Sequence, residues 1–220
     1  MKFETELYSS KKDNYFSYQR EEMLSFVPNE AFSILDVGCS SGDFGKLLKD
    51  RRGCEVWGIE PTKAAFDANK YLDFVFHETF HSELDFKGKK FDAIIFNDVL
   101  EHLTNPWDAL ELAKKNLKDG GHIIASIPNV QCYIVIRELV LEGDWKYKIS
   151  GILDKTHYRF FTRKSIFRLF EEIGFEIELI EGQNSVLSQS RLLRILKLFF
   201  PKKLEPFLFI NYAIRAKIKM

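Results

Sequence analysis

The sequence has few cysteines, no long apolar run and no net charge, and each shortage excludes a class of protein. Its three cysteines, Cys39, Cys54 and Cys132, are too widely spaced for a CxxC pair, which argues against a disulfide framework or a structural zinc site. No apolar run reaches the roughly 18–20 residues that cross a bilayer, and residues 1–10 hold no apolar core of a secretion signal. We therefore expect a protein of the reducing cytoplasm.

The balanced charge hides an uneven distribution along the chain. There are 32 basic and 32 acidic residues, yet residues 185–220 contain eight basic residues and a single acid, Glu205. Such a stretch is most often a solvated helix face, although an anionic substrate or a membrane surface would also attract it. The sequence leaves these three interpretations open.

Size and hydrophobic periodicity favour a single α/β domain. With 220 residues, 45% of them hydrophobic, the chain can fill one sizeable core and is short for two. Apolar runs alternate with helical patterns from residue 32 onward, which is typical of a parallel sheet with crossover helices. Strands are expected at residues 32–37, 55–59, 74–76, 91–96, 122–127, 175–180 and 207–218. Helices are expected at residues 15–26, 43–52, 61–72, 106–117, 163–173 and 187–200. The last strand would most simply be an antiparallel edge or hairpin partner.

Helix boundaries carry recognisable capping residues. Asn105 precedes Pro106, and Thr162 precedes the helix at residues 163–173. An Asn or Thr side chain can accept a hydrogen bond from a free amide at a helix start, and proline at the first helical position lacks the donor that would be left unpaired. Both residues are therefore predicted as N-caps.

Residues 34–42, Ile-Leu-Asp-Val-Gly-Cys-Ser-Ser-Gly, join the first predicted strand to a helix. Small residues there let the backbone approach a ligand at the carboxyl edge of the sheet. The dinucleotide fingerprint fails because Ser40 and Asp43 stand where it needs glycine, and a phosphate-binding P-loop fails at Ser40 and Leu47. Asp36 also suits a positive amine or sulfonium better than a pyrophosphate, which it would repel.

Glu60 ends the second predicted strand, eighteen residues after Gly42. A carboxylate at this place can accept hydrogen bonds from both hydroxyls of a ribose. Taken alone, the turn at residues 38–42 could be a packing turn. Together with Glu60 and the strand–helix order, it indicates a site for an adenosine-containing ligand.

Four ordered motifs carry a resemblance to a known family: residues 35–42 (LDVGCSSG), 58–60 (GIE), 91–102 (FDAIIFNDVLEH) and 117–121 (LKDGG). Over residues 30–182 the sequence resembles class I S-adenosylmethionine-dependent methyltransferases, in particular a small bacterial group similar to quinone-precursor and sugar or polysaccharide O-methyltransferases. The resemblance implies a Rossmann-like, doubly wound seven-stranded sheet, mostly parallel with an antiparallel last strand. Ser40 departs from the family pattern, in which many members have glycine.

The resemblance also implies the cofactor, S-adenosylmethionine, and its binding residues. The methyl donor would lie across the first two strand ends, with its adenine near residues 78–80. The cofactor-binding residues implied in this way are Asp36, Gly38, Cys39, Gly42, Glu60 and Asn97.

Methyl transfer from a sulfonium needs positioning, plus a base when the acceptor is a hydroxyl, and no metal is expected. His102 and His157 are the candidate bases; His102 could equally be structural. Residues 128–161 form an insert, and inserts at this place cover the acceptor pocket in the fold that the sequence resembles. We expect His157 to act as the base and Arg159 to bind an acidic or phosphorylated acceptor.

Tyr158 and Trp145 are the further substrate-binding candidates in the insert. The alternative is that Asp154, His157 and Arg159 merely lock the insert to the sheet. The sequence of residues 154–162 resembles the corresponding segment of methyltransferases that accompany glycosyltransferases in surface-polysaccharide gene sets.

The expected organisation is an N-terminal helical lid segment at residues 1–30, followed by a methyltransferase domain at residues 31–220. The lid rests on an aromatic stripe at Tyr15, Phe16 and Tyr18, which plain packing would also explain. Within the domain we expect the insert at residues 128–161 and a basic helix-strand segment at residues 185–220. That basic segment suits peripheral contact with the inner face of a membrane.

The expected function is O-methylation of a sugar or surface-polysaccharide precursor by a cytoplasmic enzyme. O-methylation of a lipophilic phenol or quinone precursor is the alternative within enzymes, and a non-catalytic S-adenosylmethionine-binding partner is the alternative outside them. The acceptor is thus expected to be a small molecule or glycan. Nucleic acid is not expected, because residues 97–100 lack the Pro-Pro-aromatic pattern used on exocyclic amines.

Overall fold

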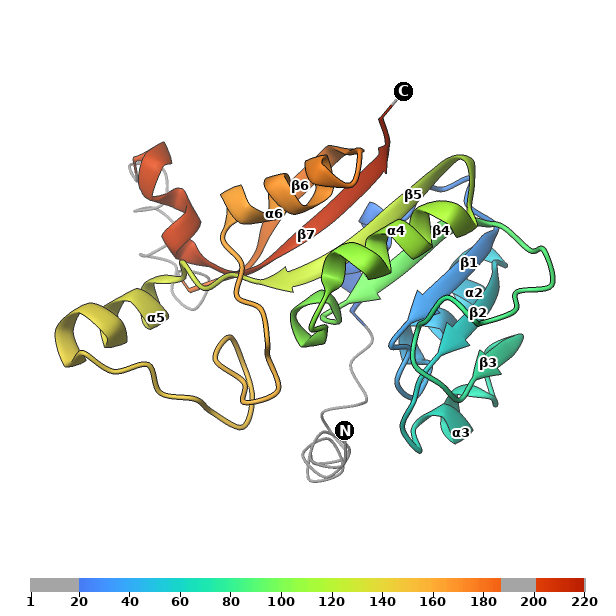
Figure 1. The fold of residues 1–220 in the computed structure, drawn as a ribbon, viewed down its shortest axis with the longest axis horizontal. Coiled ribbons are helices and arrows are strands. Elements are labelled where there is room, and N and C mark those ends of the chain that lie inside the picture. Colours follow the sequence, from blue (N-terminus) through green and yellow to red (C-terminus); the bar gives the residue numbers. More distant parts are fainter. Residues whose placement is uncertain (1–19, 187–200, 220) are drawn as a thin grey trace.

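Seven strands form one mixed sheet in the order β3-β2-β1-β4-β5-β7-β6 (Figure 1). The computed structural model of the chain describes residues 20–186 and 201–219. The strands are β1 Ser33–Val37, β2 Glu55–Ile59, β3 Phe74–Phe76, β4 Phe91–Asn97, β5 Leu117–Pro128, β6 Phe175–Ser185 and β7 Phe209–Ile218. Strands β1 to β5 are parallel, and β7 runs antiparallel to both of its neighbours, β5 and β6. The doubly wound, mostly parallel sheet with an antiparallel last strand is confirmed.

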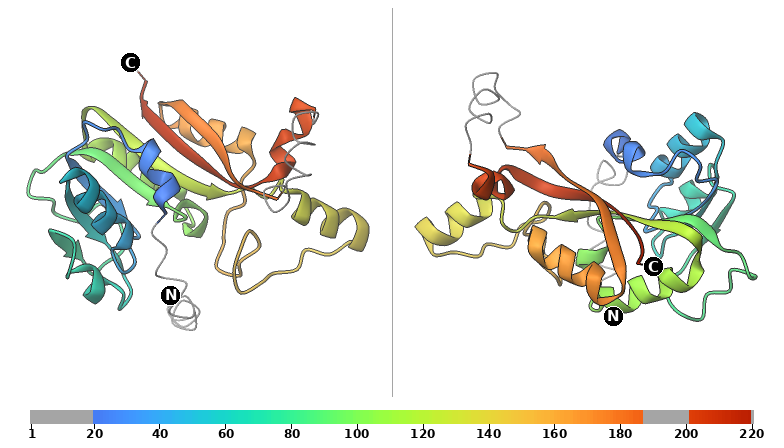
Figure 2. Two further views of the ribbon diagram at one scale, coloured as in Figure 1. Left: turned by 180° about the vertical axis from the view of Figure 1, so that it is seen from behind. Right: turned by 90° about the horizontal axis from the view of Figure 1, so that it is seen from above.

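Helices cover both faces of this sheet (Figure 2). The 3-10 helix η2 Glu21–Phe26 and the helices α2 Asp43–Arg52 and α3 Ala65–Ala68 pack into one core cluster. The helices α4 Pro106–Asn116 and α6 Arg163–Glu172 pack into the other. The remaining helices are η3 Leu100–His102, α5 Tyr133–Arg137, the π-helix η4 Glu138–Glu142 and the 3-10 helix η5 Lys202–Leu208. In the described ranges, no helix is both long and apolar enough to cross a membrane.

Strand periodicity divides the core between the two faces. In β4, Ile94 and Phe96 pack toward α4 and α6, whereas Ala93 and Ile95 pack toward η2, α2 and α3. Successive side chains of a strand alternate in this way, so Asn97 shares its face with Ile95. A run that is apolar on both faces is expected for a parallel strand covered by helices on both sides.

The register of the parallel strands gathers polar residues at one edge. Val37 is paired with both Ile59 and Phe96, so Asp36, Glu60 and Asn97 lie at neighbouring strand ends. Asn97 is in turn paired with Ser126. The carboxyl ends of β1, β2, β4 and β5 therefore supply the side chains of the candidate site.

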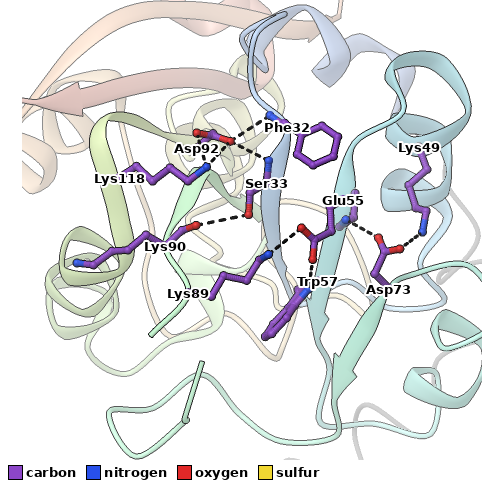
Figure 3. Close-up of polar contacts among 11 residues, drawn as sticks. Phe32, Ser33, Lys49, Glu55, Trp57, Asp73, Lys89, Lys90, Asp92 and Lys118 are labelled. Atoms are coloured by element: carbon purple, nitrogen blue, oxygen red, sulfur yellow. Dashed lines mark hydrogen bonds and ion pairs between the residues drawn. The ribbon is translucent and has the colours of Figure 1, made fainter. Parts of the chain in front are cut away.

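The opposite, amino-terminal edge is held by ionic contacts (Figure 3). Asp92 accepts hydrogen bonds from the Ser33 amide at 2.8 Å and from Lys118 Nζ at 3.0 Å. Glu55 accepts one from Lys89 Nζ at 2.7 Å, and this bond lowers the pKa of the Glu55 carboxyl. These contacts hold the amino-terminal ends of neighbouring strands together. The polar residues at the carboxyl ends of the strands are not part of this network.

The helix expected at residues 61–72 is wrong in its length, since only Ala65–Ala68 is α-helical. The amide of Thr62 donates to Glu60 Oε1 at 2.9 Å, and the amide of Ala64 donates to Thr62 Oγ1 at 3.3 Å. Those amides have no intrahelical partner in any helix. The next amides, of Ala65 and Phe66, donate to carbonyls three residues back at 3.2 and 3.1 Å, so the segment enters in tighter turns than an α-helix makes.

The two predicted N-caps differ in outcome. Thr162 caps α6, with Thr162 Oγ1 accepting from the Ser165 amide at 3.3 Å and Ser165 Oγ accepting from the Thr162 amide at 2.9 Å. Asn105 precedes α4 and its Pro106, but its side chain makes no capping hydrogen bond. The prediction of an Asn105 side-chain cap is therefore wrong, although α4 begins where proline at the first position indicates.

One of the two expected placements of the last strand is wrong and the other is confirmed. It is not an edge, because β7 inserts between β5 and β6 and leaves β6 as the edge strand, but it pairs antiparallel with β6, the preceding strand, as a hairpin partner does. Strand β5 begins at Leu117, five residues before the expected strand at residues 122–127. The helix expected at residues 187–200 lies outside the described residues.

Only the end of the predicted N-terminal lid lies within the described residues. The segment Glu21–Phe26 is a 3-10 helix, not an α-helix, and Met23 and Phe26 are buried in the core beside α2. Residues 1–19, with the aromatic stripe, lie outside the described residues, so the lid stays a prediction.

Candidate active site

The loop between β1 and α2 follows a left-handed path that glycine permits. Gly38 has φ +71°, and a Cβ added there would lie 2.6 Å from Val99 Cγ2. The amides of Gly38 and Cys39 both donate to the Ile59 carbonyl, at 2.7 and 3.1 Å, so the loop is tied to the end of β2. Gly42, with φ +82°, starts α2 against the backbone of Ala68. The loop backbone is thereby fixed beside Glu60.

Cys39 differs from the other predicted cofactor-binding residues because its side chain belongs to the core. It is buried, and a Cβ on Gly58 would lie 2.6 Å from its Sγ. Burial raises the pKa of the Cys39 thiol well above its ordinary value. Cys39 therefore packs in the core and does not present a reactive thiolate.

Glu60 is a buried carboxylate in a fixed orientation. Its Oε2 accepts the Ser40 amide at 3.0 Å and its Oε1 accepts the Thr62 amide at 2.9 Å, and the residue is 6% exposed. A carboxylate oxygen can accept two hydrogen bonds, so each retains one lone pair for a further donor. Two such acceptors side by side match the two hydroxyls of a ribose.

Asp36 lies one strand away from Glu60, and it is 2% exposed. Burial raises its pKa to about 7; the positive charge of Arg20 opposes this rise and the negative charge of Glu60 adds to it. The carboxyl group is therefore poised between its two forms at neutral pH. A cationic group placed against it would favour the charged form.

Arg20 brings the N-terminal segment to the same edge. Its guanidinium forms an ion pair with Asp98 and donates to Ser126 Oγ at 3.1 Å, while Ser126 donates to Asp98. Sequence reasoning missed Arg20 and Ser126 as site residues and saw Asp98 only as part of a motif. Nothing in the local sequence indicates a contact between residues 106 positions apart.

Asn97 presents unsatisfied polar atoms at this edge. Both its Oδ1 and its Nδ2 are buried, and neither has a hydrogen-bond partner within the part of the chain that the structure describes. Buried polar groups are normally hydrogen-bonded, so an unpaired amide at a strand end indicates a bound ligand as its partner. This observation fits the prediction of Asn97 as a cofactor contact.

The two predicted catalytic histidines lie together. The rings of His102 and His157 are 4.6 Å apart at an interplanar angle of 77°. His102 Nδ1 lies 3.0 Å from the Thr156 carbonyl oxygen, and His157 Nδ1 lies 2.9 Å from that of Ile152.

Glu101 completes this cluster, with Oε1 4.0 Å from His157 Nε2. Sequence reasoning overlooked it, although it directly precedes His102 in the motif. Glu101 is 1% exposed and His157 is 7% exposed. The cluster of Glu101, His102 and His157 thus joins η3, which follows β4, to the insert at residues 128–161.

Backbone and side-chain bonds lock the insert onto η3. The Glu101 carbonyl accepts the amides of Tyr158 and Arg159 at 2.9 and 3.0 Å. Asp154 Oδ1 accepts from the amide and the hydroxyl of Thr156, at 2.9 and 2.7 Å. These contacts agree with the alternative in which this segment holds the insert in place, and they leave a chemical role for His157 open.

The three predicted substrate contacts, Arg159, Tyr158 and Trp145, differ in their surroundings. The Arg159 guanidinium donates to the Thr104 carbonyl, through Nε at 3.1 Å, and lies 5.7 Å from the ring centroid of Trp107. Tyr158 is 49% exposed, and the ring of Trp145 packs 5.2 Å from that of Phe160. Their contact with a substrate stays a prediction, and Arg159 has a structural role besides.

The chain matches the family described as "Methyltransferase domain" over residues 5–180. A curated relative, the ubiquinone biosynthesis O-methyltransferase of Alkalilimnicola ehrlichii, is 34% identical over 107 residues, which are 46% of this chain and 43% of the relative. The match thus spans less than half the length of that protein.

Two solved structures share the fold over nearly the whole chain. An S-adenosylmethionine-dependent methyltransferase from Archaeoglobus fulgidus has a TM-score of 0.59 and 20% identity, covering 98% of this chain and 97% of that one. The plantazolicin methyltransferase BpumL, in complex with S-adenosylhomocysteine, has a TM-score of 0.63 and 15% identity, covering 99% and 94%.

The site fits the donor that this family uses. The Asn97 amide, which has no hydrogen-bond partner among the described residues, and the fixed carboxylate of Glu60 lie where an adenosine ligand is predicted to bind. The contact of Asp36 with the donor amine stays a prediction. The protein belongs to the class I S-adenosylmethionine-dependent methyltransferases, with S-adenosylmethionine as its cofactor.

Proposed function

We propose that this enzyme methylates a hydroxyl oxygen of a small molecule. The observation that carries the proposal is the cluster of Glu101, His102 and His157 at the end of β4, because O-methylation needs a group that takes the hydroxyl proton. Val99, two residues before Glu101, contacts the glycine loop at Gly38. The proton-accepting groups and the donor loop are thus adjoining parts of one edge.

Each residue has a distinct task in this proposal. Glu60 binds the ribose, Asn97 hydrogen-bonds the donor, and Asp36 pairs with its amine, while the ion pair of Arg20 and Asp98 fixes the edge. The bound S-adenosylmethionine supplies an activated methyl group on a sulfonium. A hydroxyl held against the cluster gives up its proton there, and Glu101, 4.0 Å from His157 Nε2, stabilises a positive charge on the imidazole.

A lipophilic phenol is the acceptor class that we favour. The insert exposes apolar side chains, among them Val140, Leu141 and Ile149, which are 70%, 76% and 80% exposed. Apolar side chains this exposed are typical of an interaction site for an apolar ligand or a membrane. The name of the Alkalilimnicola ehrlichii relative supports the same class.

A sugar or surface-polysaccharide precursor is the second candidate. Tyr158 is half exposed and Trp145 partly so, and aromatic faces beside a few polar groups are typical of pockets that bind ring-shaped ligands. A cytoplasmic enzyme in peripheral contact with a membrane, through residues 185–220, stays a prediction for either acceptor.

Formation of S-adenosylhomocysteine with two probe acceptors tests the proposal. We expect turnover with a prenylated catechol, and none above background with a nucleotide sugar. Replacing His157 by Gln should lower kcat about a hundredfold or more, since a positioned proton acceptor contributes about 10²–10⁴. The matched control is His122→Gln, because His122 lies in β5 and contacts Glu178 at 3.1 Å, away from the cluster.

Two results would contradict parts of this proposal. Methylation of the nucleotide sugar alone would move the second acceptor class to first place. Undiminished turnover by His157→Gln, with His122→Gln as the reference, would remove His157 from the chemistry and leave it as a residue that holds the insert.

A further inference from the structure

The cluster of Glu101, His102 and His157 has the composition of a metal site. One ligand atom of each residue, a carboxylate oxygen and two imidazole nitrogens, lies within 4.8 Å of the other two. Two of the residues come from η3, and the third, His157, comes from the insert, where the neighbouring Thr156 contacts His102. Locking of the insert onto η3 therefore assembles the three ligands.

Both imidazoles are oriented as metal ligands are. Each Nδ1 faces a backbone carbonyl, of Thr156 at 3.0 Å and of Ile152 at 2.9 Å. A carbonyl can only accept, so each neutral ring carries its proton on Nδ1 and its lone pair on Nε2. Metal-binding histidines are typically fixed in this way by a carbonyl or carboxylate on the other ring nitrogen.

The separations are those of a site that closes on an ion. Ligand atoms around a tetrahedral ion at about 2.1 Å lie roughly 3.4 Å from one another. Glu101 Oε1 and His157 Nε2 are 4.0 Å apart, so a small side-chain rotation brings them to that spacing. Both residues are buried, which excludes most competing water.

The ligand set indicates which ions fit. Two imidazoles and one carboxylate suit divalent first-row transition metals such as Zn²⁺ and Mn²⁺. The three ligands found among the described residues are fewer than such an ion takes, as in sites that also bind a substrate. Mg²⁺ and Ca²⁺ prefer oxygen ligands throughout. An open position suits an ion that also binds a substrate oxygen.

We propose that Glu101, His102 and His157 bind a divalent transition-metal ion, which holds the acceptor hydroxyl for methylation. The inference rests on the proposed function and deepens it, and it replaces the expectation that no metal is required. A cation lowers the pKa of a hydroxyl placed against it. With their Nε2 lone pairs on the ion, the two imidazoles act as ligands in place of proton acceptors, so the hydroxyl proton leaves to water. The oxygen forms a bond to the methyl carbon, and the carbon–sulfur bond breaks with its electron pair staying on sulfur.

Direct metal titration tests the site without any acceptor. The full chain, free of affinity tags and stripped with a chelator, would be titrated calorimetrically with Zn²⁺, Mn²⁺ and Mg²⁺. We expect one transition-metal ion per chain and much weaker binding of Mg²⁺. Glu101→Gln and His102→Gln should each weaken metal binding at least tenfold. Even residues that only hydrogen-bond to a metal ligand typically change metal affinity by about 10–100-fold. His122→Gln, which removes a histidine paired with a carboxylate elsewhere, should bind like wild type.

Two further readouts keep the test decisive. Co²⁺ substituted into wild type should give visible absorption bands that Glu101→Gln and His102→Gln lose. Binding of S-adenosylhomocysteine shows that each variant is folded, and His102→Gln, at a half-buried position, serves if the buried Glu101→Gln fails to fold.

Several outcomes would overturn the inference. These are no stoichiometric binding by wild type, equal binding by the variants and wild type, or full methylation of the acceptor by chelator-treated enzyme with no metal bound. Failure of the proposed function is distinguishable from these: metal would bind as expected, but no hydroxyl acceptor would be methylated.

Discussion

Replacing Asp36 by Asn is expected to weaken donor binding at least tenfold and, at the same time, to stabilise the ligand-free protein at pH 8. The substitution removes the carboxylate that pairs with the donor amine, and hydrogen bonds to charged groups contribute about 1.5–3 kcal/mol. It also removes a buried charge, because Asp36 is 2% exposed. If the buried Asp36 carboxylate binds the donor amine and destabilises the ligand-free protein, Asp36→Asn should show both weaker donor binding and higher stability.

The sign of the pH dependence follows from the raised pKa. Folding raises the pKa of Asp36 from 3.8 to about 7, so the folded state holds the proton more tightly and this group destabilises the fold as pH rises between those values. At about 1.4 kcal/mol per pKa unit, the cost above pH 7 is at most roughly 4 kcal/mol. The gain in melting temperature of Asp36→Asn should therefore be large at pH 8 and shrink toward pH 5.

Donor affinity should change with pH in the opposite sense. The ionised carboxylate binds the amine, so the affinity of wild type for S-adenosylhomocysteine should increase about tenfold from pH 6 to pH 7.5, whereas the variant should show a flat profile. Thermal denaturation at both pH values and calorimetric titration of S-adenosylhomocysteine measure the two effects. An Asp36→Asn protein that binds the ligand like wild type, or is less stable at pH 8, would refute this role.

Replacing Glu60 by Ala should lower the affinity for S-adenosylhomocysteine at least a hundredfold. Two hydrogen bonds from ribose hydroxyls to a carboxylate are lost, at about 1.5–3 kcal/mol each. The loop also loses its acceptors for the amides of Ser40 and Thr62. Glu60→Gln, which keeps the shape and loses the charge, should fall between wild type and Glu60→Ala.

Glu55→Ala is the matched control, because Glu55 lies at the other end of the same strand and contacts Lys89. It should lose some thermal stability and keep full donor affinity in the same calorimetric titration. Equal losses of affinity in Glu55→Ala and Glu60→Ala would mean that the effect comes from general weakening of β2, not from a ribose contact.

Local sequence signals predicted many of the elements well. Helix α2 and strands β2 and β3 have the expected bounds, because short apolar runs are flanked by glycine or turn residues. The helix expected at residues 61–72 is shorter because the amides of Ala65 and Phe66 donate to carbonyls three residues back, in tighter turns than an α-helix makes. Local periodicity does not distinguish these turns from an α-helix.

Long-range pairing accounts for the other differences. The final strand has clear alternation, yet its place between β5 and β6 depends on partners far away in the chain. The contacts of Arg20 with Asp98 and Ser126, and the approach of His157 to Glu101, are of the same kind. The motif residues at strand ends could be predicted from sequence, whereas the residues that meet them from other segments could not.

A crystal structure of the complex with S-adenosylhomocysteine tests the central claim most directly. The account predicts that the ribose hydroxyls bind the Glu60 carboxylate, that the amine lies against Asp36, and that the sulfur faces the cluster of Glu101, His102 and His157. A ribose with no contact to Glu60, or a sulfur directed away from that cluster, would contradict it.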